Sequence, residues 1–428
     1  MVSLGCPKNR VDSERTLWAL KEAGVEITDD ESLADLFIAN TCGFTADAKE
    51  ESIETILRLA KIKEERPGRK LAVMGCLTER YGEELKDSVP EIDHIYGIAR
   101  LREVIEDLAP DPSSVYPDPD AGPRLLTTAP HWAYLKIAEG CSNTCSFCVI
   151  PSIRGPYRSR NLDSLIAEAT ALAGQGVKEL IVVAQDTTLY GADLRLDNGL
   201  ENLLRQLARI DGIEWIRSLY MYPRLISDRL LDFFAGEEKM APYFDLPLQH
   251  ISNSVLRRMN RPDTSESIQE LIDRIRAKIP AAALRASFIV GFPGETDGDF
   301  DQLLQFAKET RFDHLGAFIY SPEEGTGAYS LTEKVEDDIA LERYDTFMRT
   351  QKEIVDEKAR EKTGKNFDII VDPPGAEDML LTGRMITQAP EIDGVVILDS
   401  VEARPGDIIS VKITGSVEYD LIGTDPRI

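Results

Sequence analysis

Residues 139–148 read EGCSNTCSFC and place Cys141, Cys145 and Cys148 in one short loop, directly after an apolar segment at 134–138. Three thiolates this close can each bind one iron of a [4Fe–4S] cluster, for which cysteine is the usual ligand. No further cysteine follows in the sequence, so the fourth iron would stay open to a ligand from outside the chain. Structural zinc is the alternative, but it needs four ligands, and no histidine lies nearby downstream. We predict an iron–sulfur cluster on these three cysteines, the tight trio.

The sequence on either side of this loop alternates apolar segments with amphipathic ones. The predicted strands of the middle segment are 134–138, 179–184, 215–220, 244–248, 284–290 and 315–320. Amphipathic stretches such as 162–173 and 268–279 separate them, which is typical of repeated βα units. Six such units predict an open, incomplete (β/α)6 barrel over residues 131–362, ending in a long charged helix at 334–362.

The first segment, residues 1–108, has the same alternation and carries the other three cysteines. Apolar runs at 2–4, 37–39 and 71–74 predict parallel strands, and 50–62 predicts a helix, so we expect a doubly wound α/β domain. Cys6, Cys42 and Cys76 each stand just past one of these strands. The carboxyl ends of parallel strands line one crevice, so this dispersed trio can converge on a second cluster. The alternative is three unrelated buried cysteines, which are common as small apolar residues.

The same geometry groups polar residues at the carboxyl face of the predicted barrel, where β/α barrels place their active sites. The segment 287–296, SFIVGFPGET, runs from a strand into a Gly/Pro loop that lets backbone approach a ligand. Gln185 follows the second strand of the barrel. The run PSIRGPYRSR carries Arg154, Arg158 and Arg160, which would form a solvated face or orient acidic substrate groups.

Two further segments complete the chain. Residues 109–130 hold six prolines among Asp, Ser and Gly, a composition typical of a linker. Residues 363–428 contain short β candidates at 367–371, 394–398, 407–413 and 416–421, which predict a small β-barrel.

Composition narrows the protein class. The chain has 428 residues and a net charge of −26, which argues against a nucleic-acid-binding surface over the whole chain. No window reaches the roughly 18 uninterrupted apolar residues of a membrane helix, and the first residues lack the pattern of a signal peptide. We therefore expect a cytoplasmic protein, in a compartment that keeps cysteines reduced.

Over essentially its full length the chain resembles the methylthiotransferases of the radical S-adenosylmethionine (SAM) superfamily. The matching segments are SLGCPKNRVDSE, NTCGF and MGCL in the first domain, EGCSNTCSFCVIPSIRGPYRSR in the second, and PLQHIS, RRMNR and FIVGFPGET farther on. The C-terminal module resembles the TRAM β-barrel. A non-catalytic iron–sulfur carrier would be a third class of function, and the SAM-type loop at 287–296 argues against it.

The resemblance implies two [4Fe–4S] clusters and SAM as cofactors, and an external electron donor such as a flavodoxin or ferredoxin. The cluster on the tight trio would bind SAM, and its reduction would cleave SAM to a 5′-deoxyadenosyl radical that abstracts a substrate hydrogen. The cluster on the dispersed trio would deliver sulfur to the substrate radical, and a second SAM would supply the methyl group. By the same resemblance we expect SAM contacts at Phe147, Gln185, Ser287, Val290, Gly291, Pro293 and Gly294.

Members of the family differ in substrate. One branch modifies adenosine 37 of transfer RNA, and the other modifies an aspartate β-carbon of small-subunit ribosomal protein number twelve. The tail from Thr363 to Ile428 has five basic and twelve acidic residues, hence a charge of −7. An acidic module suits a basic ribosomal protein, free or on the ribosome, better than transfer RNA. The segments APEIDG, AQDTTLYG and YSPEEGT also resemble the ribosomal-protein branch, so we predict that substrate and keep transfer RNA as the alternative.

Overall fold

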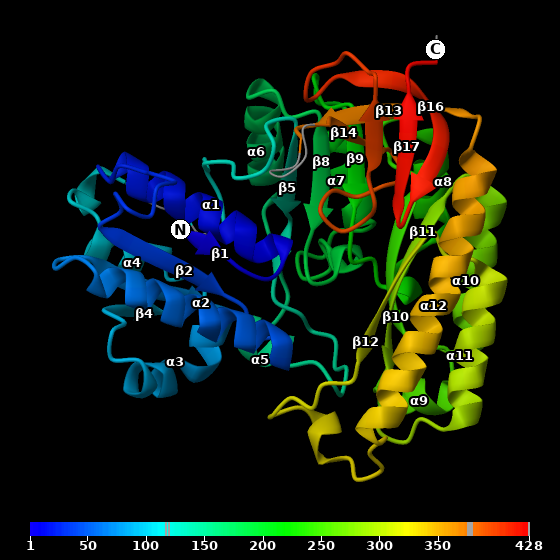
Figure 1. Cartoon of the computed structure of the whole chain (residues 1–428), viewed down its shortest axis with the longest axis horizontal. Helices are drawn as coiled ribbons and strands as arrows, with labels where there is room; N and C mark the ends of the chain where they lie inside the picture. The colour runs from blue at the N-terminus through cyan, green and yellow to red at the C-terminus, as the bar shows by residue number, and fades with distance from the viewer. Residues whose placement is uncertain (116–117, 119, 375–379, 427–428) are drawn as a thin grey trace.

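The computed structural model describes residues 1–115, 118, 120–374 and 380–426. Figure 1 shows an N-terminal α/β part, a central partial barrel and a C-terminal β-barrel. Part of the predicted linker (116, 117 and 119) and part of the tail (375–379 and 427–428) lie outside the described residues.

The N-terminal part is a parallel sheet covered by helices on both faces, as the sequence predicts. The strands follow the order β1 (Val2–Ser3), β2 (Leu36–Thr41), β3 (Lys70–Gly75) and β4 (His94–Tyr96). Side chains alternate across a strand, so Ile38 packs with α1 (Pro7–Glu22) and α4 (Leu101–Leu108) on one face. Its neighbour Phe37 packs with α2 (Ala46–Glu64) and α3 (Cys76–Ser88) on the other face.

The central part is the predicted open barrel of six parallel strands in two three-stranded sheets. The first sheet is β5 (Trp132–Lys136), β8 (Glu179–Val183) and β9 (Trp215–Ser218), and the second is β10 (Tyr243–Gln249), β11 (Ala283–Val290) and β12 (His314–Ile319). Backbone hydrogen bonds from Ala241 to Ile216 (2.8 Å) and from Met221 to Asp245 (2.9 Å) join the two sheets.

Helices cover the outside of this barrel, and shorter elements lie at its carboxyl end. The outer helices are α6 (Leu162–Gly174), α7 (Gly199–Leu207), α8 (Asp228–Gly236), α10 (Ser265–Lys278), α11 (Asp297–Thr310) and α12 (Asp337–Lys362). The short elements are β6 (Ala138–Glu139), β7 (Arg158–Ser159), α5 (Ile150–Arg154) and α9 (Asn253–Arg258). The long predicted helix at 334–362 is α12, and it begins three residues later than expected because the backbone is still extended at its N-cap, Glu336 (φ −61°, ψ 142°).

The barrel lumen is filled at its amino end and accessible at its carboxyl end. Val11 of α1 and Ala389 of the C-terminal barrel pack inside the lumen against Trp132 and Tyr243. Toward the carboxyl end the inward-facing residues of three strands are partly exposed: Pro247, Gln249, Ser287, Ile289, Gly316 and Phe318. The residues between them are buried under the helices: Leu246, Leu248, Phe288, Val290, Leu315 and Ala317. Inward-facing Phe318 is 57% exposed, so a partner molecule can reach this end of the lumen.

The C-terminal part is a closed five-stranded barrel, as predicted, although its strands differ from the expectation. The order is β13 (Asn366–Asp372), β14 (Thr382–Met385), β15 (Val396–Asp399), β17 (Asp420–Thr424) and β16 (Ile408–Val417). The expectation of one strand at 416–421 is wrong, because the chain turns between β16 and β17 at Glu418, which has a positive φ of 51°.

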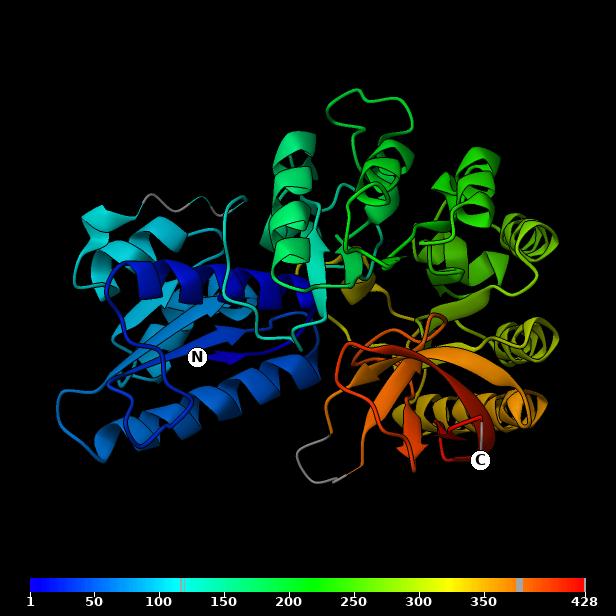
Figure 2. The ribbon, with the colours of Figure 1, turned by 90° about the horizontal axis from the view of Figure 1, so that it is seen from above.

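This barrel docks on the amino ends of the central strands through buried ion pairs, and Figure 2 shows it beside α12. Glu179, at the start of β8, is fully buried and lies 2.6 Å from Arg384 of β14 and 2.9 Å from Arg217 of β9. Burial alone would raise the pKa of Glu179, but the two guanidinium groups hold it below its usual value. The C-terminal barrel is therefore fixed to the end of the central barrel that is opposite the cysteines.

The segment that composition assigns to a linker is anchored at its far end. Arg124 is 5% exposed, lies 2.7 Å from Glu14 of α1 and 3.2 Å from Glu168 of α6, and so ties the N-terminal part to the central barrel. Figure 2 shows the N-terminal part and the barrel side by side, with α1 beside the barrel. Such buried charges are held in place because loss of one partner leaves the other unpaired.

Candidate functional site

The loop that carries the tight trio is held at the carboxyl end of the barrel by backbone hydrogen bonds. Pairing of β6 with β7 sets the base of the loop, and the Cys141 amide donates to the Gly155 carbonyl at 3.1 Å. Farther along, the Ser146 amide donates to Met259 (2.9 Å) and its carbonyl accepts from the Ala328 amide (2.7 Å). The three thiols are free and are gathered in a loop fixed by three separate parts of the barrel.

The dispersed trio is brought together by three loops that leave room only for glycine. Cys6 caps α1, Cys42 follows β2 directly, and Cys76 begins α3 after β3. A side chain at Gly5, where φ is +83°, would meet the Cys42 Cβ at 2.8 Å and its Sγ at 3.0 Å. A side chain at Gly43 would meet the Cys76 carbonyl oxygen at 2.9 Å. The structure therefore places all three loops in contact at one edge of the sheet, as parallel strand topology leads us to expect.

The two trios face each other across a short apolar contact. Cys76 packs with Val149, which follows directly after Cys148, the last cysteine of the tight trio, and with Ile153 of α5. This contact joins α3 of the N-terminal part to α5 of the barrel. Two sets of free thiols thus lie on opposite sides of the junction between the two parts.

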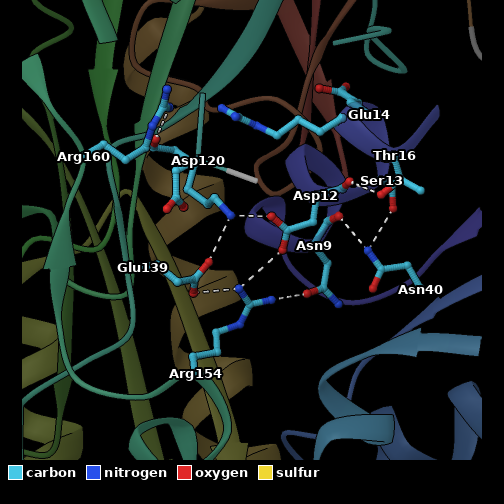
Figure 3. A network of polar contacts seen from close by, with 12 residues as sticks. Asn9, Asp12, Ser13, Glu14, Thr16, Asn40, Asp120, Glu139, Arg154 and Arg160 are labelled. Atoms are coloured by element: carbon cyan, nitrogen blue, oxygen red, sulfur yellow. Dashed lines mark hydrogen bonds and ion pairs between the residues drawn. The ribbon is translucent and has the colours of Figure 1, made fainter. Parts of the chain in front are cut away.

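Arg154 at the end of α5 is the polar centre of this junction, as Figure 3 shows. Its guanidinium group donates to Glu139 (2.8 Å), to the Cys76 thiol (3.4 Å) and to the side-chain oxygen of Asn9. Asn9 in turn donates to the backbone oxygens of Leu4 and Thr41, both at 3.0 Å. One barrel residue therefore supports the N-terminal loops that present the dispersed trio.

The electrostatic environment differs among the six thiols. Burial raises the pKa of Cys76 and of Cys148 to about 12, and it also raises the pKa of Cys42 and Cys141. Cys6 differs: burial would raise its pKa, but the charges of Lys8 and Arg154 lower it below the usual value. Metal ligands must be deprotonated, and loading a metal supplies the positive charge that buried thiolates otherwise lack.

The donor set fits iron–sulfur clusters better than a single ion. Among the described residues no three Cys, His, Asp or Glu side chains are grouped closely enough to bind one metal ion. A [4Fe–4S] cluster has a different requirement, because each thiolate binds its own iron. Beside the tight trio, the side-chain oxygen of Gln185 is buried and accepts no hydrogen bond, so an amino group bound there would supply the missing donor. Both observations fit a cluster with SAM beside it.

The other residues expected to contact SAM differ in how they could do so. Ser287 faces the lumen and is partly exposed, and Phe147 packs edge-on against Phe292 with ring centroids 6.4 Å apart. The Val290 side chain points away from the lumen into the helix layer, and its carbonyl already accepts from the Tyr320 amide at 2.9 Å. In the following loop, Pro293 is buried and the positive φ angles of Gly291 (+72°) and Gly294 (+82°) set the turn. Close packing also requires glycine at position 291, because a side chain there would meet Ala340 of α12 at 2.6 Å.

Several polar residues of the site could not be assigned from the sequence. The solvated-face interpretation of the arginine run is wrong for Arg154 and Arg160, which are 7% and 3% exposed, because each is buried in an ion pair, Arg154 with Glu139 (2.8 Å) and Arg160 with Glu168 (2.7 Å). Asn9 and Lys8, both buried in the first turns of α1, do not stand out in the sequence either. The available signal was Lys8, a cation at a helix start, where a positive charge is unfavourable.

A loop after β12 closes the other side of the junction. Glu323 is 3% exposed and lies 2.9 Å from both Lys49 of α2 and Arg80 of α3. Arg80 also donates to the Gly43 carbonyl at 2.7 Å, beside Cys42. Glu323, from the segment YSPEEGT, therefore holds the barrel loop against the loops of the dispersed trio.

Comparison with known families matches each of the three parts. Residues 1–97 match "Uncharacterized protein family UPF0004", residues 135–307 match "Radical SAM superfamily" and residues 363–424 match "TRAM domain". Among solved structures, a radical SAM methyltransferase, TsrM, from Kitasatospora setae has a TM-score of 0.55 at 15% identity, covering 77% of this chain and 74% of that one. That similarity supports the fold of the central barrel.

Curated relatives match nearly the whole chain. The protein from Geotalea uraniireducens (strain Rf4) is 48% identical, covering 99% of this chain and 97% of the relative. The protein from Geobacter sulfurreducens is 47% identical with the same coverage, and one from Anaeromyxobacter sp. (strain Fw109-5) is 46% identical over 98% of this chain and 91% of the relative. All three are named ribosomal protein uS12 methylthiotransferase RimO. With its radical SAM and TRAM domains, this chain is a radical SAM enzyme and belongs to the RimO methylthiotransferase family.

Proposed function

We propose that this enzyme transfers a methylthio group to the β-carbon of an aspartate in ribosomal protein uS12, using two [4Fe–4S] clusters and SAM. The observation that carries the proposal is the pair of free cysteine trios facing each other across Val149 and Ile153. Relatives 46–48% identical over nearly the whole chain carry the corresponding name. We assign the parts as an N-terminal domain (1–108), a connecting segment (109–130), the radical SAM barrel with its long helix (131–362) and the TRAM barrel (363–428).

We assign separate roles to the two trios. Cys141, Cys145 and Cys148 would hold the cluster beside SAM, and Cys6, Cys42 and Cys76 would hold the cluster that serves sulfur insertion. When bound, these groups supply the radical, sulfur and methyl chemistry. The chain itself contributes position: Gln185 accepts from the SAM amino group, and Phe147, Ser287 and the backbone of 290–294 line the rest of that site.

Further expectations concern the cellular context. SAM cleavage consumes one electron, for which we propose an external donor such as a flavodoxin or ferredoxin. None of the helices within the described residues is both long and apolar enough to cross a membrane. We place the enzyme in the cytoplasm, where its thiols would stay reduced.

The charge of the TRAM barrel supports a basic protein substrate. Arg384, one of its few cations, is 1% exposed and paired with Glu179, so it adds nothing to the outer surface. The exposed side chains of the described barrel include five acidic residues, Asp368, Glu391, Asp399, Glu402 and Glu418. The exposed cations there are Lys365, Arg404 and Lys412. Complementary potential of this kind favours a basic partner and repels nucleic acid.

A direct assay of substrate choice tests the proposal. The anaerobically reconstituted enzyme, reduced in the presence of SAM, receives ribosomal protein uS12 and unmodified transfer RNA in parallel. We expect mass spectrometry to find one added methylthio group on an aspartate of the protein and none on the RNA. Modification of adenosine in the transfer RNA instead would keep the family and overturn the substrate.

Charge reversal on the TRAM barrel should weaken substrate binding. We expect Asp399→Lys with Glu402→Lys to raise the Kd for uS12 by about tenfold at low salt, with a smaller effect at high salt because exposed charges are screened. The matched control, Glu270→Lys with Asp301→Lys, makes the same change of charge on exposed positions of α10 and α11. Deleting residues 363–428 would be a poorer test, because it would leave Glu179 buried without Arg384. Equal affinity of both double variants would refute the role of the acidic surface.

A further inference from the structure

Lys8 is a buried cation for which the described part of the chain provides no carboxylate partner, and the acidic groups that face it are the Cys6 thiol and the Tyr220 hydroxyl. Its side chain is 6% exposed, and none of the described carboxylates lies within ion-pair distance of it. Its nitrogen instead lies 3.6 Å from the centroid of the Tyr220 ring. Every other buried cation at this junction has a carboxylate: Lys136 pairs with Asp12 and Glu139, and Arg154 pairs with Glu139.

The position of Lys8 is unfavourable for stability in two further ways. It is the second residue of α1, after Cys6 at the cap and Pro7, so it lies at the positive end of the helix dipole. It also shares the junction with the Arg154 cation. A buried cation in such a place without a carboxylate partner costs free energy, and such local costs are tolerated mainly at functional sites.

Lys8 lies beside the part of the lumen that a partner can reach. Tyr220 follows β9 at the carboxyl end of the barrel, and its amide donates to the Asp245 side chain of β10 at 2.8 Å. Its φ of 55° is unusual for a non-glycine residue, and the Asp245 bond holds the ring under the Lys8 nitrogen. Around that end, the inward-facing residues of β10, β11 and β12 are partly exposed.

We propose that Lys8 binds the side-chain carboxylate of the substrate aspartate and is the residue that selects this amino acid. The proposal rests on the proposed function and identifies the group that recognises the substrate. In aspartate the carboxylate carbon is bonded directly to the β-carbon. A carboxylate held by Lys8, two residues from Cys6, therefore brings that carbon beside the dispersed trio. Tyr220 is a positioning residue, because it fixes the Lys8 nitrogen.

The binding experiment compares uS12 carrying the target aspartate with uS12 carrying asparagine at that position. Holoenzyme with both clusters and SAM, kept oxidised so that no turnover occurs, is titrated with each protein. We expect the wild type to prefer aspartate by about 10- to 100-fold, the usual range for a charge-assisted hydrogen bond. In Lys8→Met the affinity for the aspartate form falls by that factor, and the asparagine form binds as it does to wild type. Lys8→Arg keeps a preference for aspartate.

The control variant is Lys61→Met, which removes the same charge from an exposed position of the same domain. Iron content and the optical spectra of the clusters are measured for every variant. An aspartate preference in Lys8→Met equal to that of wild type overturns the proposal. The proposal is also overturned if Lys8→Met loses about four irons per chain while its preference for aspartate is unchanged. Lys8 would then serve only to hold the cluster. If wild type binds neither form, the proposed substrate itself fails.

Discussion

A Cys141→Ala variant is expected to lose reductive cleavage of SAM while it keeps the iron bound at the dispersed trio. We expect the rate of 5′-deoxyadenosine formation to fall at least about 100-fold. Mutation of a residue that only supports a metal ligand typically costs about 10- to 100-fold in metal affinity or activity. Cys141 is itself a proposed ligand, so its loss should cost at least as much. The measurement is 5′-deoxyadenosine after addition of dithionite and SAM to the reconstituted variant.

The fold of this variant should survive, because the loop does not depend on the thiol. Hydrogen bonds of the Cys141, Ser146 and Cys148 backbones hold it, and the side chain of Cys141 is small. We expect the free energy of unfolding to fall by about 1 kcal/mol, the centre of the range for point substitutions. A variant that forms 5′-deoxyadenosine at the wild-type rate would refute the assignment of the tight trio to SAM.

Much of the architecture is predictable from local patterns. Strands buried on both faces of a parallel sheet read as apolar runs, so 37–39 and 71–74 locate β2 and β3 within one or two residues at each end. The dispersed trio is also within reach of prediction, because topology alone places the carboxyl ends of parallel strands together. In both cases a local signal and a general rule of chain connection are sufficient.

The unpredicted features depend on partners distant in sequence. β14 reads TGRM, which has no apolar alternation, and it is fixed by pairing with β13 and by the Arg384–Glu179 contact. Arg124 lies in a proline-rich segment and is buried only because Glu14 and Glu168 meet it from two different domains. No local pattern contains such information, since tertiary contacts override composition there.

A Cys42→Ala variant is expected to separate the two halves of the reaction. Cys42 lies across the junction from the tight trio, in a loop tied to Ser52 of α2 by two hydrogen bonds of 3.0 Å. Its replacement should leave the cysteine loop unchanged, since no hydrogen bond of the described structure joins Cys42 to residues 140–149. We expect 5′-deoxyadenosine formation within about twofold of wild type, and methylthiolated uS12 reduced at least about 100-fold.

The two cysteine variants serve as controls for each other, because each removes one thiol and keeps the opposite trio. Iron content should fall by about four atoms per chain in each, since a [4Fe–4S] cluster is held by its thiolates and loses its site with one of them. Mass spectrometry of uS12 then distinguishes the variants: Cys42→Ala cleaves SAM without adding a methylthio group, and Cys141→Ala does neither.

Methylthiolated uS12 from Cys42→Ala at the wild-type level would show that sulfur insertion does not depend on the dispersed trio. Loss of SAM cleavage in Cys42→Ala would instead mean that the two cluster sites depend on each other structurally, through the contact of Cys76 with Val149 and Ile153.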